Sequence, residues 1–150
     1  MENPYTFQPI GPDQLEQIKA LFVSVFTTEP WNDDWSDPQQ LNCYLMDLIG
    51  QSNSLSYGLF EDETLIGIAL GHIKHWYTGT EYCIEELCIR TDRQGGGLGT
   101  QFLRQIEQAV KLHGVEHLFL QTSEDVPAYR FYQKNGFVPL QGHVSLTKQL

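Results

Sequence analysis

A chain of 150 residues with 41% hydrophobic and 12% aromatic content can build one domain around a buried core. Its formal net charge of −10 arises in the first 64 residues, which carry eleven acidic side chains and one lysine, whereas the remainder carries eight of each sign. Such a field repels nucleic acids and anionic membranes and attracts cationic ligands, so neither of those two partners is expected. Solubility is the alternative explanation of the acidity.

Cysteine spacing and hydropathy provide a first expectation about the compartment. Cys43, Cys83 and Cys88 show no CxxC spacing, so they predict neither a disulfide framework nor a zinc site. No apolar run approaches the roughly 18 residues of a membrane-spanning helix, and the N-terminal residues lack the pattern of a signal peptide. We therefore expect a single cytoplasmic domain over residues 1–150 that binds no metal ion.

The first half of the chain predicts one strand, two helices and a hairpin. A short strand at residues 6–10 precedes a helix that Asp13 caps and whose apolar residues keep helical spacing from Leu15 to Phe26. Prolines, tryptophans and acids at residues 27–38 indicate an irregular connection. A second helix continues from Leu41 and ends at Gly50, and alternation then predicts hairpin strands at residues 54–61 and 64–76.

The second half predicts a strand, a helix that follows a glycine-rich turn, and four further elements. Strands are expected at residues 82–90, 115–122, 137–140 and 143–150, and helices from Leu98 to Val110 and over residues 126–135. The order is then β-α-α-β-β-β-α-β-α-β-β. This order indicates an α+β or α/β fold with a mixed sheet and helices on both faces.

The stretch RTDRQGGGLGTQFL, residues 90–103, places four glycines directly before a predicted helix. Free backbone N–H groups at such a helix N-terminus form an anion site. A P-loop requires Lys-Ser/Thr after its last glycine, but Thr100 and Gln101 follow Gly99. The pattern GxGxxG also fails, because Thr100 or Phe102 stands where its last glycine is required. A turn that only packs a helix against its strand is the alternative.

Two motifs together resemble the GNAT superfamily of N-acetyltransferases. Gln-x-x-Gly-x-Gly at residues 94–99 resembles the acyl-CoA pyrophosphate loop of that superfamily, with glutamine where arginine is commoner. AYRFYQKNGF, residues 128–137, is similar to its A-x-x-F-Y-x-K-x-G-F segment, and EELCI precedes the loop at the usual distance. The element order is also similar. The resemblance covers the whole chain and implies a mostly antiparallel sheet of about six or seven strands.

The resemblance implies acetyl-CoA as the cosubstrate. Its pyrophosphate would bind to backbone N–H groups of the glycine loop, and N–H groups near Leu87 and Ile89 would polarise the thioester carbonyl. One departure is Asp125, at a position where many members have asparagine. The residues implied in cofactor binding are Leu87, Cys88, Ile89, Gln94, Gly95, Gly96, Gly97, Leu98, Gly99, Thr100 and Asp125.

Acetyl transfer from a thioester to an amine requires a base for the amine and a proton for the leaving thiolate. Glu85 and Glu86 are the candidate bases. As strand neighbours they point to opposite faces, and a bulge would change which of them faces the site, so the choice stays open. The family pattern implies Tyr132 as the proton donor to the thiolate. Packing within its helix is the alternative role of this tyrosine.

The segment TTEPWNDDWSD, residues 27–37, combines tryptophan with carboxylates. Aromatic rings stack on cations and carboxylates pair with ammonium groups. The candidate acceptor-binding residues are therefore Glu29, Trp31, Asp33, Asp34 and Trp35, and packing of the two tryptophans is the alternative. The EPW stretch and the position of Glu85 are also similar to those of aminoglycoside 6′-N-acetyltransferases, a weaker resemblance than that to the superfamily.

The expected function is direct acetyl transfer, in a ternary complex, from acetyl-CoA to a primary amine of an aminoglycoside-like or polyamine-like acceptor. Two alternatives are acetylation of a protein N-terminus or lysine, and a non-catalytic acyl-CoA-binding module. A second copy of the chain is the one macromolecular partner that the resemblance suggests, because GNAT proteins are commonly dimers; no residue pattern decides between monomer and dimer.

Overall fold

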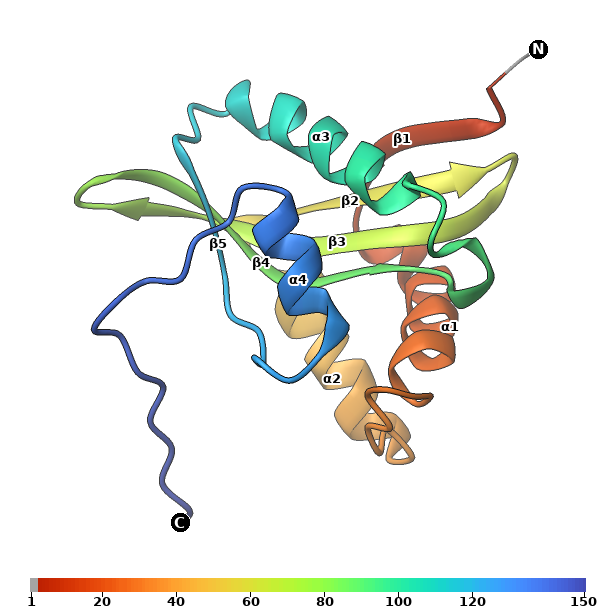
Figure 1. Cartoon of the computed structure of the whole chain (residues 1–150). Coiled ribbons are helices and arrows are strands. Elements are labelled where there is room, and N and C mark those ends of the chain that lie inside the picture. The colour runs from red at the N-terminus through yellow and green to blue at the C-terminus, as the bar shows by residue number, and fades with distance from the viewer. Residues whose placement is uncertain (1–2) are drawn as a thin grey trace.

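The computed structural model describes residues 3–150 and contains one sheet between layers of helices (Figure 1). The strands are β1 (Tyr5–Ile10), β2 (Ser54–Glu61), β3 (Thr64–Trp76), β4 (Gly79–Ile89) and β5 (His117–Leu120). The helices are α1 (Leu15–Phe26), α2 (Pro38–Ile49), α3 (Leu98–Lys111) and α4 (Pro127–Lys134), with 3₁₀ turns at Pro12–Gln14 and Thr91–Arg93. Spatial order follows chain order, and every pairing is antiparallel except that of β4 with β5.

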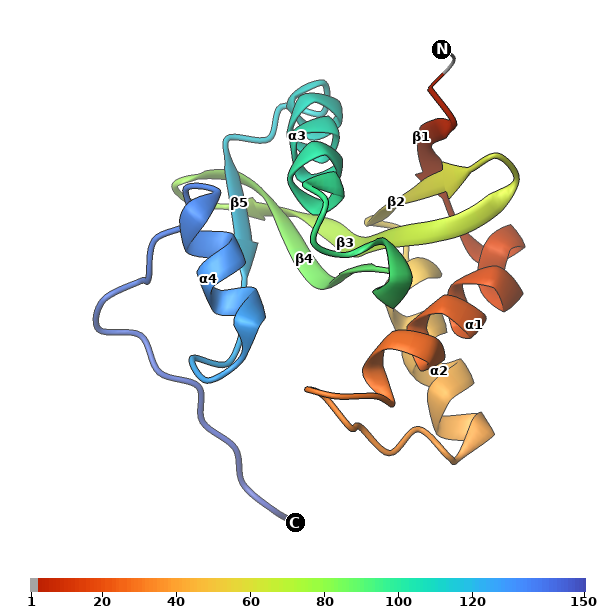
Figure 2. The ribbon, with the colours of Figure 1, turned by 45° about the vertical axis from the view of Figure 1, so that its right-hand side comes forward.

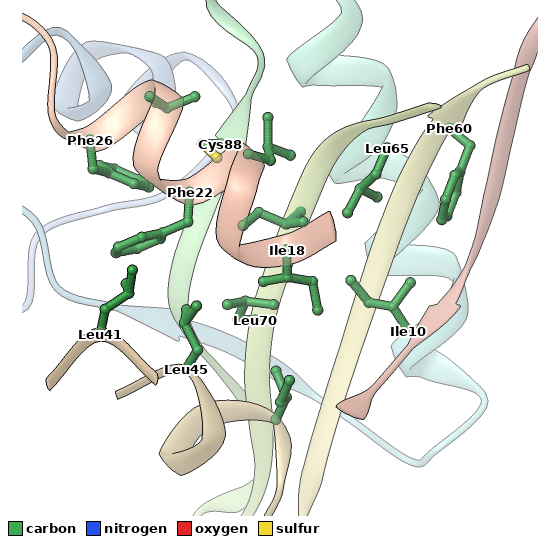
Figure 3. Close-up of a cluster of buried hydrophobic side chains, with 14 residues drawn as sticks. Ile10, Ile18, Phe22, Phe26, Leu41, Leu45, Phe60, Leu65, Leu70 and Cys88 are labelled. Atoms are coloured by element: carbon green, nitrogen blue, oxygen red, sulfur yellow. The ribbon is translucent and has the colours of Figure 1, made fainter. Parts of the chain in front are cut away.

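Two hydrophobic clusters hold the helices to opposite faces of the sheet (Figure 2). On one face, α1 and α2 contribute Ile18, Phe22 and Leu45, which pack with Leu70 of β3 (Figure 3). On the other face, α3 contributes a separate row that includes Phe102. Complete burial of one such side chain stabilises the fold by roughly 2 kcal/mol. In residues 3–150, no helix combines the length and apolar character needed to cross a bilayer.

Capping of the first two helices differs in part from the expectation. Asp13 lies inside the 3₁₀ turn, because the turn starts at Pro12 and α1 begins only at Leu15. Instead, Gln14 Oε1 accepts a hydrogen bond of 2.8 Å from the Gly11 N–H. The predicted Asp13 cap is therefore wrong. At α2, Asp37 is the cap, and its Oδ1 accepts hydrogen bonds of 3.0 and 3.2 Å from the first turn of that helix.

A bulge in β4 determines which of the two adjacent glutamates faces α2. Leu70 pairs with Glu86, but the next residue of β3, Gly71, pairs with Ile84, so Glu85 is the extra residue. The strands are unusually close there, because a Cβ at Gly71 would lie 2.5 Å from the backbone oxygen of Cys83. Before the bulge, the even-numbered residue Ile84 packs in the cluster under α3. After the bulge, the odd-numbered residue Ile89 packs there, so the bulge reverses which residues of β4 face α3. Glu86 consequently lies on the α1–α2 face.

The C-terminal part departs most from the expectation. β5 is shorter than predicted, and residues 137–150, all described, contain no strand, so the strands predicted at residues 137–140 and 143–150 are wrong. The sheet has five strands within residues 3–150, and the expected six or seven are not confirmed. The reason is that an alternating pattern forms a strand only beside a partner, and none pairs with this segment here.

Candidate active site

A cleft of about 280 Å³ opens where β4 extends beyond β5. Pairing of these strands stops at Ile84 and Leu120, whereas β4 continues to Ile89. The last residues of β4 therefore have no strand partner on that side within the described chain, and their backbone groups face the cleft. Several elements line the cleft, namely β4 (Leu87, Cys88, Ile89), the glycine loop and α3 (Gln94, Gly95, Gly99, Phe102), α4 (Pro127, Ala128, Phe131, Tyr132) and the end of α1 with its connection (Val25, Phe26, Pro30, Trp31).

The backbone of the glycine loop, residues 95–97, is accessible to a ligand. Gly95 and Gly97 have φ values of +87° and +82°, a region that favours glycine. A Cβ built at Gly95, Gly96 or Gly97 would meet no atom within 4 Å, so the space in front of this backbone is open. In residues 3–150, the N–H groups of these three glycines donate to no other backbone group, and the first N–H groups of α3 have no intrahelical partner. These features fit a pyrophosphate.

The side chains of Arg93 and Gln94, just before the glycines, hold the loop in place. Gln94 Nε2 donates a hydrogen bond of 2.7 Å to the carbonyl oxygen of Ile89. Arg93 donates to both carboxylate oxygens of Glu61 on β2, at 2.7 and 3.0 Å. Gln94 thus lies in the cleft lining, and its side chain holds the loop to β4.

The remaining residues that were predicted to bind the cofactor differ in whether their side chains or backbone are available to a ligand in the cleft. Leu98 is buried in the core under α3, so only its backbone is available, and Thr100 lies in the first turn of that helix. Asp125 is exposed on the chain before α4 and is not part of the cleft lining. The structure thus brings together the loop and β4, but not Asp125.

Glu86 is a carboxylate inside the protein with one well-defined partner. The hydroxyl of Tyr44, on α2, donates a hydrogen bond of 2.6 Å to Glu86 Oε1. Partial burial raises the pKa of Glu86, the hydrogen bond from Tyr44 lowers it, and the charges of Asp33 and Glu85 raise it; together these effects bring the pKa to about 7. Near neutral pH this carboxyl group therefore exchanges a proton readily, as a general base must.

Glu85 occupies a different environment. As the bulged residue it is 46% exposed, and its Oε1 lies 3.8 Å from His72 Nδ1. Glu85 is therefore open to solvent and is not part of the cleft lining. Nowhere in residues 3–150 are three or more His, Cys, Asp or Glu side chains grouped so that they could hold a metal ion.

Tyr132 faces the end of β4 from the opposite wall of the cleft. Its ring packs edge-on against Phe131 and Phe137, each at 5.4 Å between centroids. Burial raises the pKa of Tyr132 well above its usual value, and Glu86 and Cys88 raise it further. Its hydroxyl is thus protonated at neutral pH. Burial likewise raises the pKa of the Cys88 thiol, so this cysteine is not a thiolate.

Sequence reasoning missed Tyr44. In the sequence this residue belongs to the apolar face of α2, and its partner Glu86 is 42 positions away, so no local pattern connects the two. The ring of Trp35 stacks on Tyr44 at 5.1 Å. Only the fold shows that this tyrosine bridges the helix layer and β4.

The predicted acceptor residues separate into two groups. Trp31 lines the cleft and packs against Phe26, at 5.4 Å between ring centroids. Trp35 packs on Phe22, and its Nε1 is buried without a hydrogen-bond partner among residues 3–150. Asp33 is near enough to Glu86 for its charge to raise the pKa of that residue. Asp33 is thus within electrostatic reach of Glu86, Trp35 stacks on its hydrogen-bond partner Tyr44, and Trp31 forms part of the cleft wall.

The other two predicted acceptor residues show no such relation to Glu86. Asp34 Oδ1 accepts a hydrogen bond of 3.0 Å from the Ser36 N–H, and hydrogen bonding by the side chain and the backbone of Ser36 lowers the pKa of Asp34. Glu29 is exposed.

Solved structures with this fold include two acetyltransferases. An aminoglycoside acetyltransferase, meta-AAC0020, from an uncultured soil metagenomic sample in complex with sisomicin has a TM-score of 0.76 and 20% identity, covering 99% of this chain and 97% of that one. Aminoglycoside N-acetyltransferase AAC(6')-Iy in complex with CoA has a TM-score of 0.72 and 16% identity, covering 100% and 98%. At these identities the likeness establishes the fold alone.

Sequence similarity extends the comparison. The chain is 27% identical over 88 residues to YobR of Bacillus subtilis (strain 168), an uncharacterized N-acetyltransferase. The aligned region spans 58% of this chain and 34% of that protein, so it covers about a third of the relative. The model of the acetyltransferase (GNAT) family matches residues 15–137, which include β4, the glycine loop and α4. The chain therefore belongs to the acetyltransferase (GNAT) family.

Proposed function

We propose that this protein transfers an acetyl group from acetyl-CoA to a primary amine of a small cationic acceptor, within a ternary complex. The observation that carries this proposal is Glu86, a partly buried carboxyl group with a pKa of about 7 that directly precedes the β4 residues of the cleft lining and lies within electrostatic reach of Tyr132 in the cleft wall. A protein that only binds acyl-CoA needs no such base.

The donor side of the site is built from backbone. N–H groups of Gly95, Gly96 and Gly97 bind the pyrophosphate, assisted by the dipole of α3. The unpaired side of β4 near Leu87 and Ile89 supplies hydrogen bonds to the pantetheine arm and to the thioester carbonyl. When bound, acetyl-CoA supplies the activated acyl group.

Glu86 and Tyr132 divide the proton transfers between them. Glu86 accepts a proton from the attacking amine, whose ordinary pKa is near 10. A carboxylate with a pKa of about 7 is a better base for this task than an ordinary glutamate. As the bond between nitrogen and the acetyl carbon forms, the bond from that carbon to sulfur breaks, and the Tyr132 hydroxyl donates a proton to the sulfur.

The acceptor side is acidic and aromatic. Asp33 lies within electrostatic reach of Glu86, and Trp31 forms part of the cleft wall. Together they favour a cation whose amine is directed at Glu86. The likeness to two aminoglycoside acetyltransferases supports an aminoglycoside-like or polyamine-like acceptor.

Release of free thiol from acetyl-CoA, measured across a panel of amines, tests the proposal. The panel contains aminoglycosides, linear polyamines, and peptides with a free N-terminus or lysine. We expect turnover with the cationic small molecules, and a loss of at least about 100-fold in kcat for Tyr132→Phe, the usual contribution of a positioned acid. Tyr129→Phe, on the same helix but absent from the cleft lining, is the control and should retain activity.

Each alternative has its own outcome in this assay. Turnover confined to peptides would instead support protein acetylation. Binding of acetyl-CoA without thiol release from any amine, together with no effect of Tyr132→Phe, would show that the chain is a binding module.

A further inference from the structure

The cleft beside β4 has an apolar lining. Of the residues within 3–150 that line it, none is Asp, Glu, Lys, Arg or His, so the carboxylates of Glu86 and Asp33 lie outside the lining. The side chain of Gln94 is already hydrogen-bonded to the backbone of Ile89. Apolar groups are favoured in such surroundings, whereas a cation would lose its hydration there without gaining a charged partner. The cleft therefore suits the pantetheine arm and the acyl group, and the amine approaches from the side of Glu86.

The carbonyl carbon of the donor has a different neighbour on each side of the cleft. In the proposed reaction its oxygen faces the unpaired backbone of β4 near Leu87 and Ile89, and its sulfur faces Tyr132 of α4. The amine nitrogen arrives from the side of Glu86, which the bulge turns toward α2. The remaining wall is the end of α1, where Phe26 lines the cleft. The acyl chain therefore extends toward this end of α1.

The end of α1 is a closely packed wall. The ring of Phe26 lies 4.9 Å from that of Phe22, between centroids (Figure 3), and 5.4 Å from that of Trp31. Val25, the other residue of α1 in the cleft lining, is also buried. The Asp33 N–H donates a hydrogen bond of 2.8 Å to the carbonyl oxygen of Phe26 and so fixes the following connection to the helix. A wall packed in this way does not retreat easily before a longer chain.

We propose that Phe26 and Val25 limit the length of the acyl group, so that this protein selects acetyl-CoA over butyryl-CoA and longer donors. The inference rests on the proposed acetyl transfer and assigns the residues that determine donor specificity. The cleft volume of about 280 Å³ is at the small end of ligand pockets, and it has to hold the pantetheine arm as well as the acyl group. Each further methylene of the donor then meets the side chains at the end of α1.

Turnover of acetyl-, propionyl-, butyryl- and hexanoyl-CoA with one amine acceptor measures the preference. In the wild type, kcat/KM should fall at least about tenfold from acetyl- to butyryl-CoA, because one methylene in excess in an apolar pocket typically changes this constant tenfold or more. Phe26→Leu shortens the wall and should reduce the ratio at least about fivefold. The matched control is Phe60→Leu, since Phe60 is 7% exposed against 6% for Phe26, belongs to the same cluster and lies outside the cleft lining (Figure 3). It should keep the wild-type ratio.

Val25 provides a second pair of variants with a smaller effect on folding. Val25→Ala removes two methyl groups from the wall and should also reduce the ratio, whereas Val25→Ile adds a methyl group and should increase it. Val23→Ala is the control, because Val23 is on the same helix but is not part of the cleft lining. Circular dichroism establishes that each variant is folded.

Calorimetric titration with the same acyl-CoA compounds, without an amine, gives a readout that does not depend on turnover. The wild type should bind hexanoyl-CoA at least about tenfold more weakly than acetyl-CoA, and Phe26→Leu should narrow this difference. A wild type that uses and binds all four donors equally, or the same preference in wild type, Phe26→Leu and Val25→Ala, overturns the inference. Equal broadening in Phe60→Leu also overturns it. Binding that depends on chain length in this way, without turnover of any donor with any amine, would overturn the proposed function and support the role of the α1 wall.

Discussion

The hydroxyl of Tyr44 donates a hydrogen bond of 2.6 Å to Glu86 Oε1 and so links α2 to the bulged part of β4. This bond favours the ionised carboxylate, whereas burial favours the neutral acid. Asp33, on the connection before α2, and Glu85, on β4, oppose ionisation of Glu86. Tyr132 and Cys88 also lie within electrostatic reach of this carboxylate. The opposing effects of burial, the hydrogen bond and the nearby charges set the pKa of Glu86, and hence the pH above which it can accept a proton.

Tyr44→Phe tests that balance and retains the ring that stacks on Trp35. Because Glu86 must be ionised to accept a proton, kcat/KM of the wild type should rise as the pH increases through about 7. Without the hydrogen bond the pKa of Glu86 rises, so this rise should move upward by about one pH unit, as a hydrogen bond to a charged group is worth roughly 1.5–3 kcal/mol. Profiles of both proteins with the same amine show the difference. An unchanged profile would assign Tyr44 a packing role.

Gly96→Asp tests the anion site without straining the backbone, because Gly96 is not among the glycines with positive φ and its Cβ would enter open space. A carboxylate placed there repels the pyrophosphate, and we expect acetyl-CoA affinity to fall by at least about tenfold. Gly96→Asn has nearly the same shape without the charge and should lose much less. Calorimetric titration with acetyl-CoA compares them. Equal losses in both variants would indicate a steric effect and leave the phosphate site unsupported.

Asp33→Asn tests attraction of a cationic acceptor. Removal of this charge should raise the acceptor KM several-fold at low ionic strength, and the difference should shrink as salt is added. It should also shift the rise in kcat/KM to lower pH, because Asp33 raises the pKa of Glu86. Asp34→Asn removes an equal charge from a residue held by Ser36, and we expect a smaller change. The same KM for both variants and wild type at low salt would refute a role for this segment in attracting the acceptor.

Local patterns in the sequence predicted most of the fold that surrounds the site. Helical spacing located α1, α2 and α3, alternation located the β2–β3 hairpin, and the glycines located the loop before α3. These features depend on residues a few positions apart, so the sequence displays them directly. Gln94 and Tyr132, which the family resemblance implied as site residues, both lie in the cleft lining.

Three features were beyond local patterns because each depends on residues far apart in the chain. The bulge that turns Glu86 toward α2 arises from the register of β4 against β3 and from the close approach at Gly71. The Tyr44 contact spans 42 positions. Residues 137–150 have a strand pattern but form no strand, because a strand forms only beside a partner edge, which a local pattern does not reveal.

Thiol release by Glu86→Gln, beside Glu85→Gln, tests the central claim most directly. Both variants remove one negative charge from adjacent residues of β4, but only Glu86 is held by Tyr44 with a pKa of about 7. With saturating acetyl-CoA and an amine acceptor, Glu86→Gln should lower kcat by at least about 100-fold and abolish the rise in rate near pH 7, as expected for loss of a general base. Glu85→Gln should keep most of the activity and the rise in rate, with that rise moved to lower pH because the charge of Glu85 raises the pKa of Glu86. Equal losses, or a greater loss in Glu85→Gln, would contradict the assignment of Glu86 as the base.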